Sequence, residues 1–442
     1  MDTMLVLVPK ITNRLSYTFD LLLRQLLGLK FELTTDPVRF AQSQSLKFVY
    51  GKQAVGDYPF FRAVDLLFER EISRQELKAF DFESIKAFFP VYDRNAMLPF
   101  DPFAASFYLV SRYEEYLPFS PDQHGRFEAS SSCLHNLGLL QKPVVNHWSR
   151  ALARALKSRF PQLIFNFPSY SFLPTYDIDA AWAYLHKGLY RSLGAYARDL
   201  INGDYTEIKT RTAVLRKNLP DPFDTFALQL SLQSKYKLHP VYFILFAEYG
   251  LNDKNISVRN PAFQKLIKQL GDYAEVGIHP SYGSFHNKQK LRSEVKALSE
   301  VLNRDVTHSR QHYLRMSLPA TYHHLIDLDI TDDYTMGYAS QPGFRAGIAN
   351  SFLFYDLDHD LITPLRIHPV TLMDGTLRDY LKLDENQALA TAFSLCDEVK
   401  AVGGTFVTLW HNETLSNQKR WKDWVAVYEK IIQYALQEGV AK

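Results

Sequence analysis

After Pro168 the chain alternates between short apolar runs and helical segments, and this alternation constrains the fold more than any other feature. Between the apolar runs, hydrophobic residues recur at helical spacing over 291–302 and 389–402. Strand–helix alternation is typical of β/α units around a parallel sheet. We therefore expect an α/β fold with a distorted (β/α)7 barrel, closed or incomplete, and a doubly wound sheet is the alternative. The expected strands span residues 173–179, 240–246, 274–279, 307–314, 332–338, 365–370 and 405–411.

The first 168 residues differ in pattern and predict a smaller α/β domain. Asp101 is the expected N-cap of one helix, and Asn146 is the expected N-cap of another. The prediction is therefore an N-terminal α/β domain of unknown function over residues 1–168, followed by the β/α barrel domain over residues 169–442. The expected elements of the first domain are strands over 4–9 and 48–51 and helices over 11–27, 102–117 and 147–160.

Composition and charge limit the class of partner. Of 442 residues, 46% are hydrophobic and 22% are charged, as is usual in globular proteins. The formal net charge is only +2, from 50 basic and 48 acidic residues. Because nucleic-acid binding needs a concentrated basic excess, we expect no nucleic-acid partner.

The sequence also suggests a compartment. Its first residues lack the basic and long apolar regions of a secretory signal. No segment approaches the run of about 18 apolar residues that a membrane span requires. The two cysteines, Cys133 and Cys396, have no metal-type spacing and fit a reducing environment. We expect a cytoplasmic protein without a membrane span, and the sequence leaves a homo-oligomer open.

Residues suited to metal or acid–base chemistry stand at or near the ends of several expected strands. Parallel β/α folds gather their active sites at the carboxyl ends of their strands. We therefore expect these side chains to lie close together. They are Asp177, Asp179, His279, Arg310, His312 and His411.

The spacing of the two aspartates strengthens this expectation. Asp177 and Asp179 are two residues apart, so in a strand both carboxylates point to one face. Two like charges on one buried face are costly unless a cation or hydrogen-bond donors compensate them. An isolated pair of this kind is more often a solvated strand end or a helix cap. The histidines at matching strand ends favour a functional site instead.

At these positions the sequence resembles the polysaccharide deacetylases, the carbohydrate esterases of family four, in a divergent branch with an additional N-terminal domain. The resemblance covers residues 173–411 by the order of its motifs. The first motif of the family, Thr-Phe-Asp-Asp-Gly, contains the catalytic base and a metal ligand. Thr175-Tyr176-Asp177-Ile178-Asp179 is similar to it, with one residue inserted between the carboxylates. The resemblance implies that Asp177 is the base and Asp179 a ligand.

Three further motifs are similar, and two of them depart from the pattern of the family. The second, His-Ser/Thr-x-x-His, supplies two metal ligands, and His279-Pro280-Ser281-Tyr282-Gly283 keeps only the first histidine. The third, Arg-x-Pro-Tyr, contains an arginine that orients the base, and Arg310-Gln311-His312-Tyr313 has histidine in place of proline. The last ends in a histidine that usually serves as the general acid, and Leu409-Trp410-His411 matches it.

The resemblance implies one divalent metal ion, zinc, but it does not identify the third protein ligand. A zinc site with an open position takes three protein ligands, and the motif match supplies only Asp179 and His279. His312 is the expected third ligand because it stands where the family has proline. His286 is an alternative. A site formed by Asp177, Asp179 and one histidine is the rival, and it leaves the base unassigned.

Three residues are candidates for substrate binding. Tyr313 follows the expected third ligand, and its backbone N–H or that of Leu314 is a candidate donor to a tetrahedral oxyanion. Trp410 is a candidate platform for a sugar ring, with core packing as the alternative. His368 either lines the site or is a buried structural histidine. Arg345 is expected at the surface.

The expected function is therefore a metal-dependent hydrolase that removes acetyl groups from a glycan or a sugar precursor, with a carbohydrate as substrate. The missing histidine of the second motif keeps open a catalytically inactive relative that binds carbohydrate. An amidase that acts on another carbon–nitrogen bond with the same site is a third hypothesis.

Overall fold

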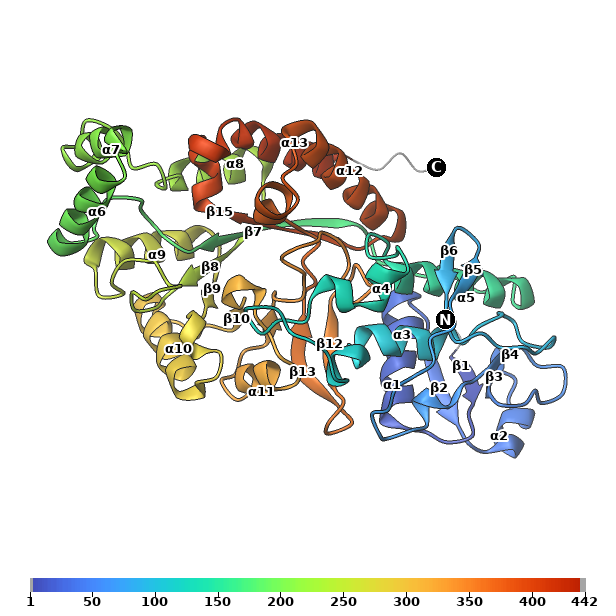
Figure 1. Ribbon diagram of the computed structural model, residues 1–442. Coiled ribbons are helices and arrows are strands. Elements are labelled where there is room, and N and C mark those ends of the chain that lie inside the picture. Colours follow the sequence, from blue (N-terminus) through green and yellow to red (C-terminus); the bar gives the residue numbers. More distant parts are fainter. Residues whose placement is uncertain (1–2, 438–442) are drawn as a thin grey trace.

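The computed structural model describes residues 3–437, in which the chain forms two separate main sheets (Figure 1). The smaller sheet has four parallel strands, and the predicted strands over 4–9 and 48–51 are confirmed as its β1 and β3. A short antiparallel hairpin of β5 (Phe80–Phe82) and β6 (Ile85–Ala87) follows it. The order of the smaller sheet is β2 (Phe31–Thr34), β1 (Met4–Leu7), β3 (Lys47–Gly51) and β4 (Phe60–Arg62).

The helices around this sheet largely follow the sequence pattern. The predicted helix over 11–27 is α1 followed by a π-helical segment, Asp20–Leu26. The cap at Asp101 is confirmed, because its Oδ1 atom accepts the backbone N–H groups of Phe103 and Ala104 at 3.0 Å each. The helices are α1 (Asn13–Phe19), α2 (Pro37–Gln42), α3 (Pro102–Val110), α4 (Cys133–Asn136) and α5 (Val144–Arg159).

The predicted cap at Asn146 is wrong. Helix α5 begins at Val144, directly after Pro143, so Asn146 lies inside the helix. Its buried carboxamide donates to Asn350 Oδ1 at 2.6 Å and accepts the N–H of Ala349 at 3.0 Å. Because these partners lie about two hundred residues further along the chain, local sequence could not reveal them.

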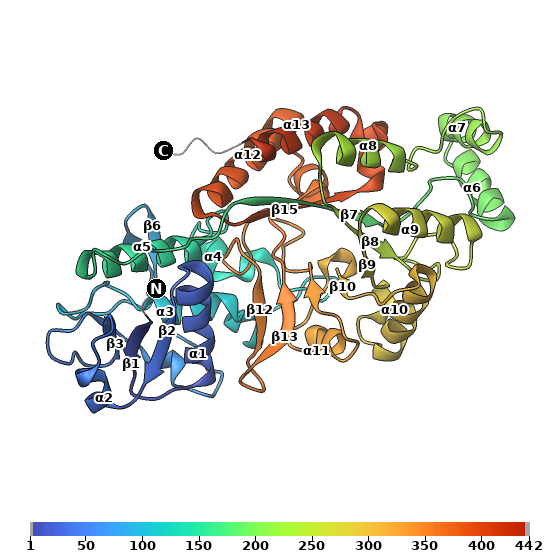
Figure 2. The same cartoon turned by 180° about the vertical axis from the view of Figure 1, so that it is seen from behind.

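The second half of the chain forms a nine-stranded sheet in which eight strands are parallel and only β12 is antiparallel. Strands β7 and β15 run side by side across the middle of the molecule (Figures 1 and 2). The order is β12 (Phe352–Asp356), β13 (Leu361–Ile367), β11 (Asp332–Asp333), β10 (His308–Ser309), β9 (Glu275–His279), β8 (Val241–Leu245), β7 (Ser171–Ile178), β15 (Thr405–His411) and β14 (Leu372–Met373).

The α/β class and the large parallel sheet are confirmed, but the expected (β/α)7 barrel is not closed within residues 3–437. The edge strands β12 and β14 each pair with one neighbour only. The predicted strands over 307–314 and 332–338 pair over two residues each, as β10 and β11. Strand β12, which the sequence pattern did not predict, forms a hairpin with β13 and ends the sheet there.

Helices cover the outer face of the large sheet (Figures 1 and 2). The connection from β7 to β8 is long, and its helices α6 and α7 project at the end of the molecule opposite the four-stranded sheet. No helix within residues 3–437 has the length and apolar character needed to cross a membrane. The helices are α6 (Leu189–Ile201), α7 (Tyr205–Leu215), α8 (Phe226–Tyr236), α9 (Pro261–Tyr273), α10 (Lys288–Leu302), α11 (Ala320–Ile326), α12 (Glu385–Val402) and α13 (Trp424–Leu436).

The two sheets share one hydrophobic core. A single cluster of buried side chains runs from β1 through α3 and α5 to β7 and α13. A buried ion-pair network also joins the halves, because both carboxylate oxygens of Glu115 bind Arg345 at 2.9 and 2.7 Å. The surface position expected for Arg345 is therefore wrong, since its side chain is 1% exposed. A domain boundary at residue 168 stays a prediction.

Candidate metal centre and active site

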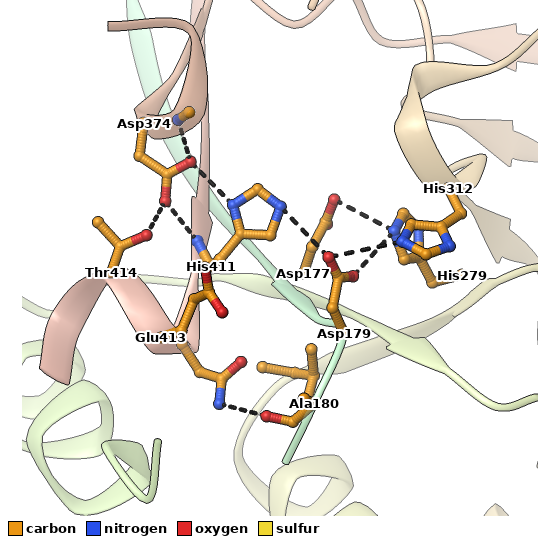
Figure 3. A network of polar contacts seen from close by, with 12 residues as sticks. Asp177, Asp179, Ala180, His279, His312, Asp374, His411, Glu413 and Thr414 are labelled. Atoms are coloured by element: carbon orange, nitrogen blue, oxygen red, sulfur yellow. Dashed lines mark hydrogen bonds and ion pairs between the residues drawn. The ribbon is translucent and has the colours of Figure 1, made fainter. Parts of the chain in front are cut away.

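Three side chains that the sequence suggested as metal ligands lie together at the carboxyl edge of the large sheet (Figure 3). Asp179 follows β7, His279 ends β9, and His312 begins the helical turn after β10. One ligand atom from each of these residues lies within 4.8 Å of those of the other two. His286, the alternative ligand, is not a member of this cluster.

Strand parity explains why these residues face one another. On β7, Tyr176 and Ile178 belong to the main core, so Asp177 points to the opposite face of the sheet. The same alternation on β15 buries Trp410 in the main core and turns His411 toward the aspartates. The period of two, which is visible in the sequence, thus places the functional side chains on one face.

The ring orientation of both histidines turns one nitrogen toward the centre. Nδ1 of His279 lies 2.5 Å from the carbonyl oxygen of Arg310, which can only accept, so this nitrogen donates. Nδ1 of His312 lies 3.0 Å from Oδ1 of Asp253. In both rings Nε2 is therefore the atom that faces Asp179. An Nδ1 hydrogen bond of this kind is the usual support of a metal-binding histidine.

The distances at the centre fit a divalent cation. Oδ1 of Asp179 lies 3.3 Å from Nε2 of His279, and Oδ2 lies 3.6 Å from Nε2 of His312. Two atoms that are each about 2.1 Å from a tetrahedral zinc ion are about 3.4 Å apart. Oδ1 of Asp179 is also buried without a hydrogen-bond partner among the described residues. Because a shared cation would satisfy this oxygen and both nitrogens, the three residues fit as its ligands.

Asp177 is held by the arginine that the third motif suggested. Nη1 of Arg310 donates to Oδ1 of Asp177 at 2.8 Å, and both side chains are buried. Nε of Arg310 donates to the carbonyl of Tyr334 at 3.0 Å, which fixes the guanidinium. Oδ2 of Asp177 remains directed at the centre, 3.7 Å from Nε2 of His279.

His411 is held by a carboxylate on the opposite side of Asp179. Nδ1 of His411 lies 2.8 Å from Oδ1 of Asp374, which is fully buried. Oδ2 of Asp374 accepts the backbone N–H of His411 at 2.7 Å and the hydroxyl of Thr414. Nε2 of His411 therefore faces inward, 3.7 Å from Oδ2 of Asp179 (Figure 3).

Charge within the centre shifts the pKa values of three groups. Burial alone lowers the pKa of His312, but Asp179 and Asp253 outweigh burial and raise it to about 9. Burial likewise lowers the pKa of His411, but Asp374 and Asp179 hold it well above its usual value. Burial raises the pKa of Asp179, yet His312 and His279 hold it well below the usual range.

The three residues suggested for substrate binding have different surroundings. The ring of Tyr313 packs beside His312 with ring centroids 4.5 Å apart, so it lies next to the centre. Trp410 is fully buried and packs against Tyr428 at 4.4 Å, so it has no face open to a sugar ring. His368 is half-buried and binds Asp332 at 2.7 Å, and its role in substrate binding stays a prediction.

Sequence reasoning missed Asp253 and Asp374, the two carboxylates that orient His312 and His411. Asp253 lies in the connection that follows β8, and Asp374 follows β14 directly. Both positions lie beyond the carboxyl ends of parallel strands, which is where functional residues gather. That rule was the available signal, although it does not identify which residue of a long connection faces the site.

A family model matches the first part of the chain, and solved structures match about 60% of the chain. Residues 4–161 match the model of a family of unknown function, DUF7033. No curated protein matches the chain. A candidate polysaccharide deacetylase from Mycobacterium smegmatis is similar in structure, with 14% identity, a TM-score of 0.41, and coverage of 61% of this chain and 86% of its own.

Two further solved structures are similar to the same extent of the chain. A polysaccharide deacetylase from Bacillus cereus has 11% identity and a TM-score of 0.30, with coverage of 60% of this chain and 87% of its own. The CE4 domain of a multidomain xylanase from the hindgut metagenome of Trinervitermes trinervoides has 9% identity, a TM-score of 0.28, and coverage of 60% and 82%.

Proposed function

We propose that this chain is a metal-dependent hydrolase that removes acetyl groups from a glycan or a sugar precursor. The observation that carries the proposal is that Nε2 atoms of three histidines, His279, His312 and His411, lie 3.3, 3.6 and 3.7 Å from the carboxylate of Asp179. Candidate ligands, a candidate base and a candidate acid together support hydrolysis, because binding a carbohydrate requires none of them.

The ligand set of two histidines and one carboxylate suits zinc. Asp179, His279 and His312 would hold a divalent cation, which would supply Lewis-acid polarisation of the acetyl carbonyl and a lowered pKa of the attacking water. Asp253 keeps the ring of His312 oriented for this role, at 3.0 Å. Support of this kind is typically worth about 10- to 100-fold in metal affinity.

In this proposal Asp177 is the general base. Its Oδ1 atom is occupied by Arg310 at 2.8 Å, so Oδ2 is the oxygen free to accept the proton of the attacking water. The fixed guanidinium of Arg310 prevents the carboxylate from rotating away from the centre. Because Oδ2 is also 3.7 Å from Nε2 of His279, a role of Asp177 as a metal ligand is the rival assignment.

His411 is the general acid in this proposal. Its raised pKa, which results from Asp374 and Asp179 acting against burial, keeps the ring protonated near neutral pH. Nε2 then carries a proton that can be donated to the leaving amine or alcohol. The hydrogen bond between Nδ1 and Asp374 holds the ring in the orientation that the donation requires.

A cytoplasmic location, which would favour a soluble sugar precursor, is part of the same proposal.

The first test is metal analysis of the full-length protein together with acetate release from acetylated chito-oligosaccharides. A matched control is available, because a second group of potential ligands, His323, Asp356 and His359, lies elsewhere in the structure. We expect His312→Ala to lose about one equivalent of zinc and all acetate release. We expect His359→Ala to keep acetate release and the zinc that His312→Ala loses.

Other outcomes favour the alternative functions. Zinc that depends on His312 without any acetate release would favour an amidase that acts on another carbon–nitrogen bond. Binding of the chito-oligosaccharide without zinc and without acetate release would favour a catalytically inactive carbohydrate-binding relative. Full turnover by His411→Ala would contradict the assignment of the general acid.

A further inference from the structure

A cavity of about 710 Å³ is lined by residues from three connections of the large sheet. Its lining residues come from helices α6 and α7 and the rest of the long connection after β7, from the connection after β8, and from the segment that follows β15. The wall residue Glu413 follows His411 by two positions. The side chain of Asn412, between them, donates to the carbonyl of Ala180, which follows Asp179, and to that of the wall residue Phe223, at 3.0 and 2.9 Å. The cavity and the metal centre therefore adjoin each other.

The cavity wall is strongly basic. Only two acidic residues, Glu207 and Glu413, contribute to it. The contrast with the whole chain is large, since basic and acidic residues number 50 and 48 overall. The basic wall residues are Lys187, Arg191, Arg198, Arg211, Lys254, Lys419 and Arg420.

Protein carboxylates balance only part of this charge. Arg198 and Arg211 both bind Asp199, at 2.9 and 2.6 Å. Lys419 binds Glu207. Arg420 binds both Asp379 and Glu413. Three cations, Lys187, Arg191 and Lys254, have no carboxylate within 4.0 Å among residues 3–437.

These three cations are gathered in one place. The guanidinium of Arg191 donates to the carbonyl of Lys254 at 3.1 Å and lies 3.8 Å from the ring centroid of Tyr249. Nζ of Lys254 lies 5.3 Å from the same ring centroid. Burial, with a smaller contribution from Arg191, lowers the pKa of Lys187 to about 8. Gathering like charges in a half-buried hollow costs free energy, and a bound anion would offset that cost.

Aromatic side chains complete the wall. Tyr184, Phe223, Tyr249 and Trp421 all line the cavity. Aromatic faces pack well against the apolar faces of sugar rings, while guanidinium and ammonium groups bind phosphate or carboxylate oxygens. The combination suits a saccharide that carries a negative charge.

We propose that this cavity binds a phosphate or carboxylate group of the substrate, so that the substrate is an anionic saccharide whose acetyl group reaches the metal centre. This inference rests on the proposed deacetylase function. Lys187, Arg191 and Lys254 hold the anionic group, and the ion-paired residues shape the wall around them. The long connection after β7 therefore determines substrate class.

The test measures binding to the full-length protein of N-acetylglucosamine 1-phosphate, of glucuronic acid and of neutral N-acetylglucosamine. The cavity variant is the double substitution Lys187→Ala with Arg191→Ala. The control is Lys209→Ala with Arg216→Ala, because these exposed residues carry the same charge on the same connection outside the cavity. We expect the cavity variant to raise the Kd of the charged ligand about tenfold or more, and the control to leave it unchanged.

Each outcome decides the proposal. If N-acetylglucosamine 1-phosphate binds more tightly than glucuronic acid, the substrate is a phosphorylated sugar. If glucuronic acid binds more tightly, the substrate contains a uronic acid. Equal affinity of the cavity and control variants, or affinity for neutral N-acetylglucosamine equal to that for both charged ligands, overturns the proposal.

A further variant, His312→Ala, distinguishes failure of the cavity site from failure of the proposed deacetylase function. In His312→Ala we expect the anion to bind as before, and loss of binding there would mean that the anion occupied the metal centre, which overturns the cavity site. The other combination is binding of the anion to His312→Ala together with no acetate release from N-acetylglucosamine 1-phosphate by the native protein. That combination would support the cavity site and contradict the deacetylase function.

Discussion

Each histidine at the proposed centre is held through its Nδ1 atom by a buried acceptor. His279 binds a backbone carbonyl, whereas His312 and His411 bind the carboxylates of Asp253 and Asp374. A carbonyl fixes the tautomer only, but a carboxylate also stabilises the protonated ring. Protons and metal therefore compete at His312, and a proton is retained at His411.

This competition predicts the pH dependence of metal binding. Since the pKa of His312 is raised to about 9, Nε2 must lose a proton before it can bind metal at neutral pH. We expect zinc affinity to rise about tenfold per pH unit up to about pH 9 and then to level off. Competition titrations with a chelator at several pH values measure this slope.

The matched variant for this prediction is Asp253→Asn. It removes one of the two carboxylates that raise the pKa of His312, so the affinity should level off at a lower pH. It should also weaken binding by about 10- to 100-fold at high pH, because the ring loses its support. Zinc affinity that does not change with pH in the native protein would contradict the assignment of His312 as a ligand.

The residues that sequence could place are those whose direction follows from strand parity. Asp177, Asp179 and His411 lie on or next to strands β7 and β15, so alternation alone turns them to one face. Asp253 and Asp374 lie in connections, and they meet their histidines across 59 and 37 residues of sequence. No local pattern encodes such contacts, since they depend on the path of each loop.

Among the elements, the loop that contains Arg126 connects the first half of the chain to the site. Nη1 of Arg126 donates to the carbonyl of Tyr313 at 2.7 Å, and its Nε donates to Asp122 at 2.8 Å. Nε of Arg315 binds the carbonyl of His124 in return, at 2.5 Å. The turn that carries His312 is therefore held from both sides by residues outside the large sheet.

This contact predicts a positioning role for Arg126. In Arg126→Ala the turn after β10 loses its hydrogen bond at Tyr313, and we expect kcat/KM for acetate release to fall roughly tenfold with zinc content retained. Arg62→Ala is the control, because it removes a similar ion pair with Asp93 at 3.0 Å away from the site. An equal effect of both variants would indicate a general loss of stability and contradict a local role.

Strand prediction succeeded for the longer parallel strands and failed for the two-residue strands β10 and β11 and for the edge strand β12. Strands β7, β8, β9 and β15 are buried between neighbours, so their apolar runs are continuous and easily recognised. Strands β10 and β11 pair over two residues each, and the apolar residues after them belong to turns that pack inward. The expected barrel is not closed within residues 3–437 because the edge strands β12 and β14 do not pair with each other.

At the scale of the whole molecule, the two halves are joined by buried charge as well as by apolar contact. Arg112 and Arg345 both bind Glu115, and all three side chains are at most 2% exposed. The guanidinium of Arg112 also donates to Glu114 at 2.9 Å and to the carbonyl of Arg345. Removing one partner from a buried, fully paired set of charges strongly destabilises the folded state, because the remaining charge cannot reach water.

The last prediction follows from this network. In Glu115→Ala both arginines lose their shared carboxylate while they remain buried, so we expect the free energy of unfolding to fall by about 3–5 kcal/mol. Glu83→Ala is the control, since Glu83 pairs with Arg154 at the surface, where ion pairs contribute about 0–1 kcal/mol. Urea denaturation of the full chain measures both. Because one core spans both sheets, the loss should lower the midpoint of a single transition. Two separate transitions, with only one of them shifted, would instead mean that the halves fold independently and that the network does not couple them.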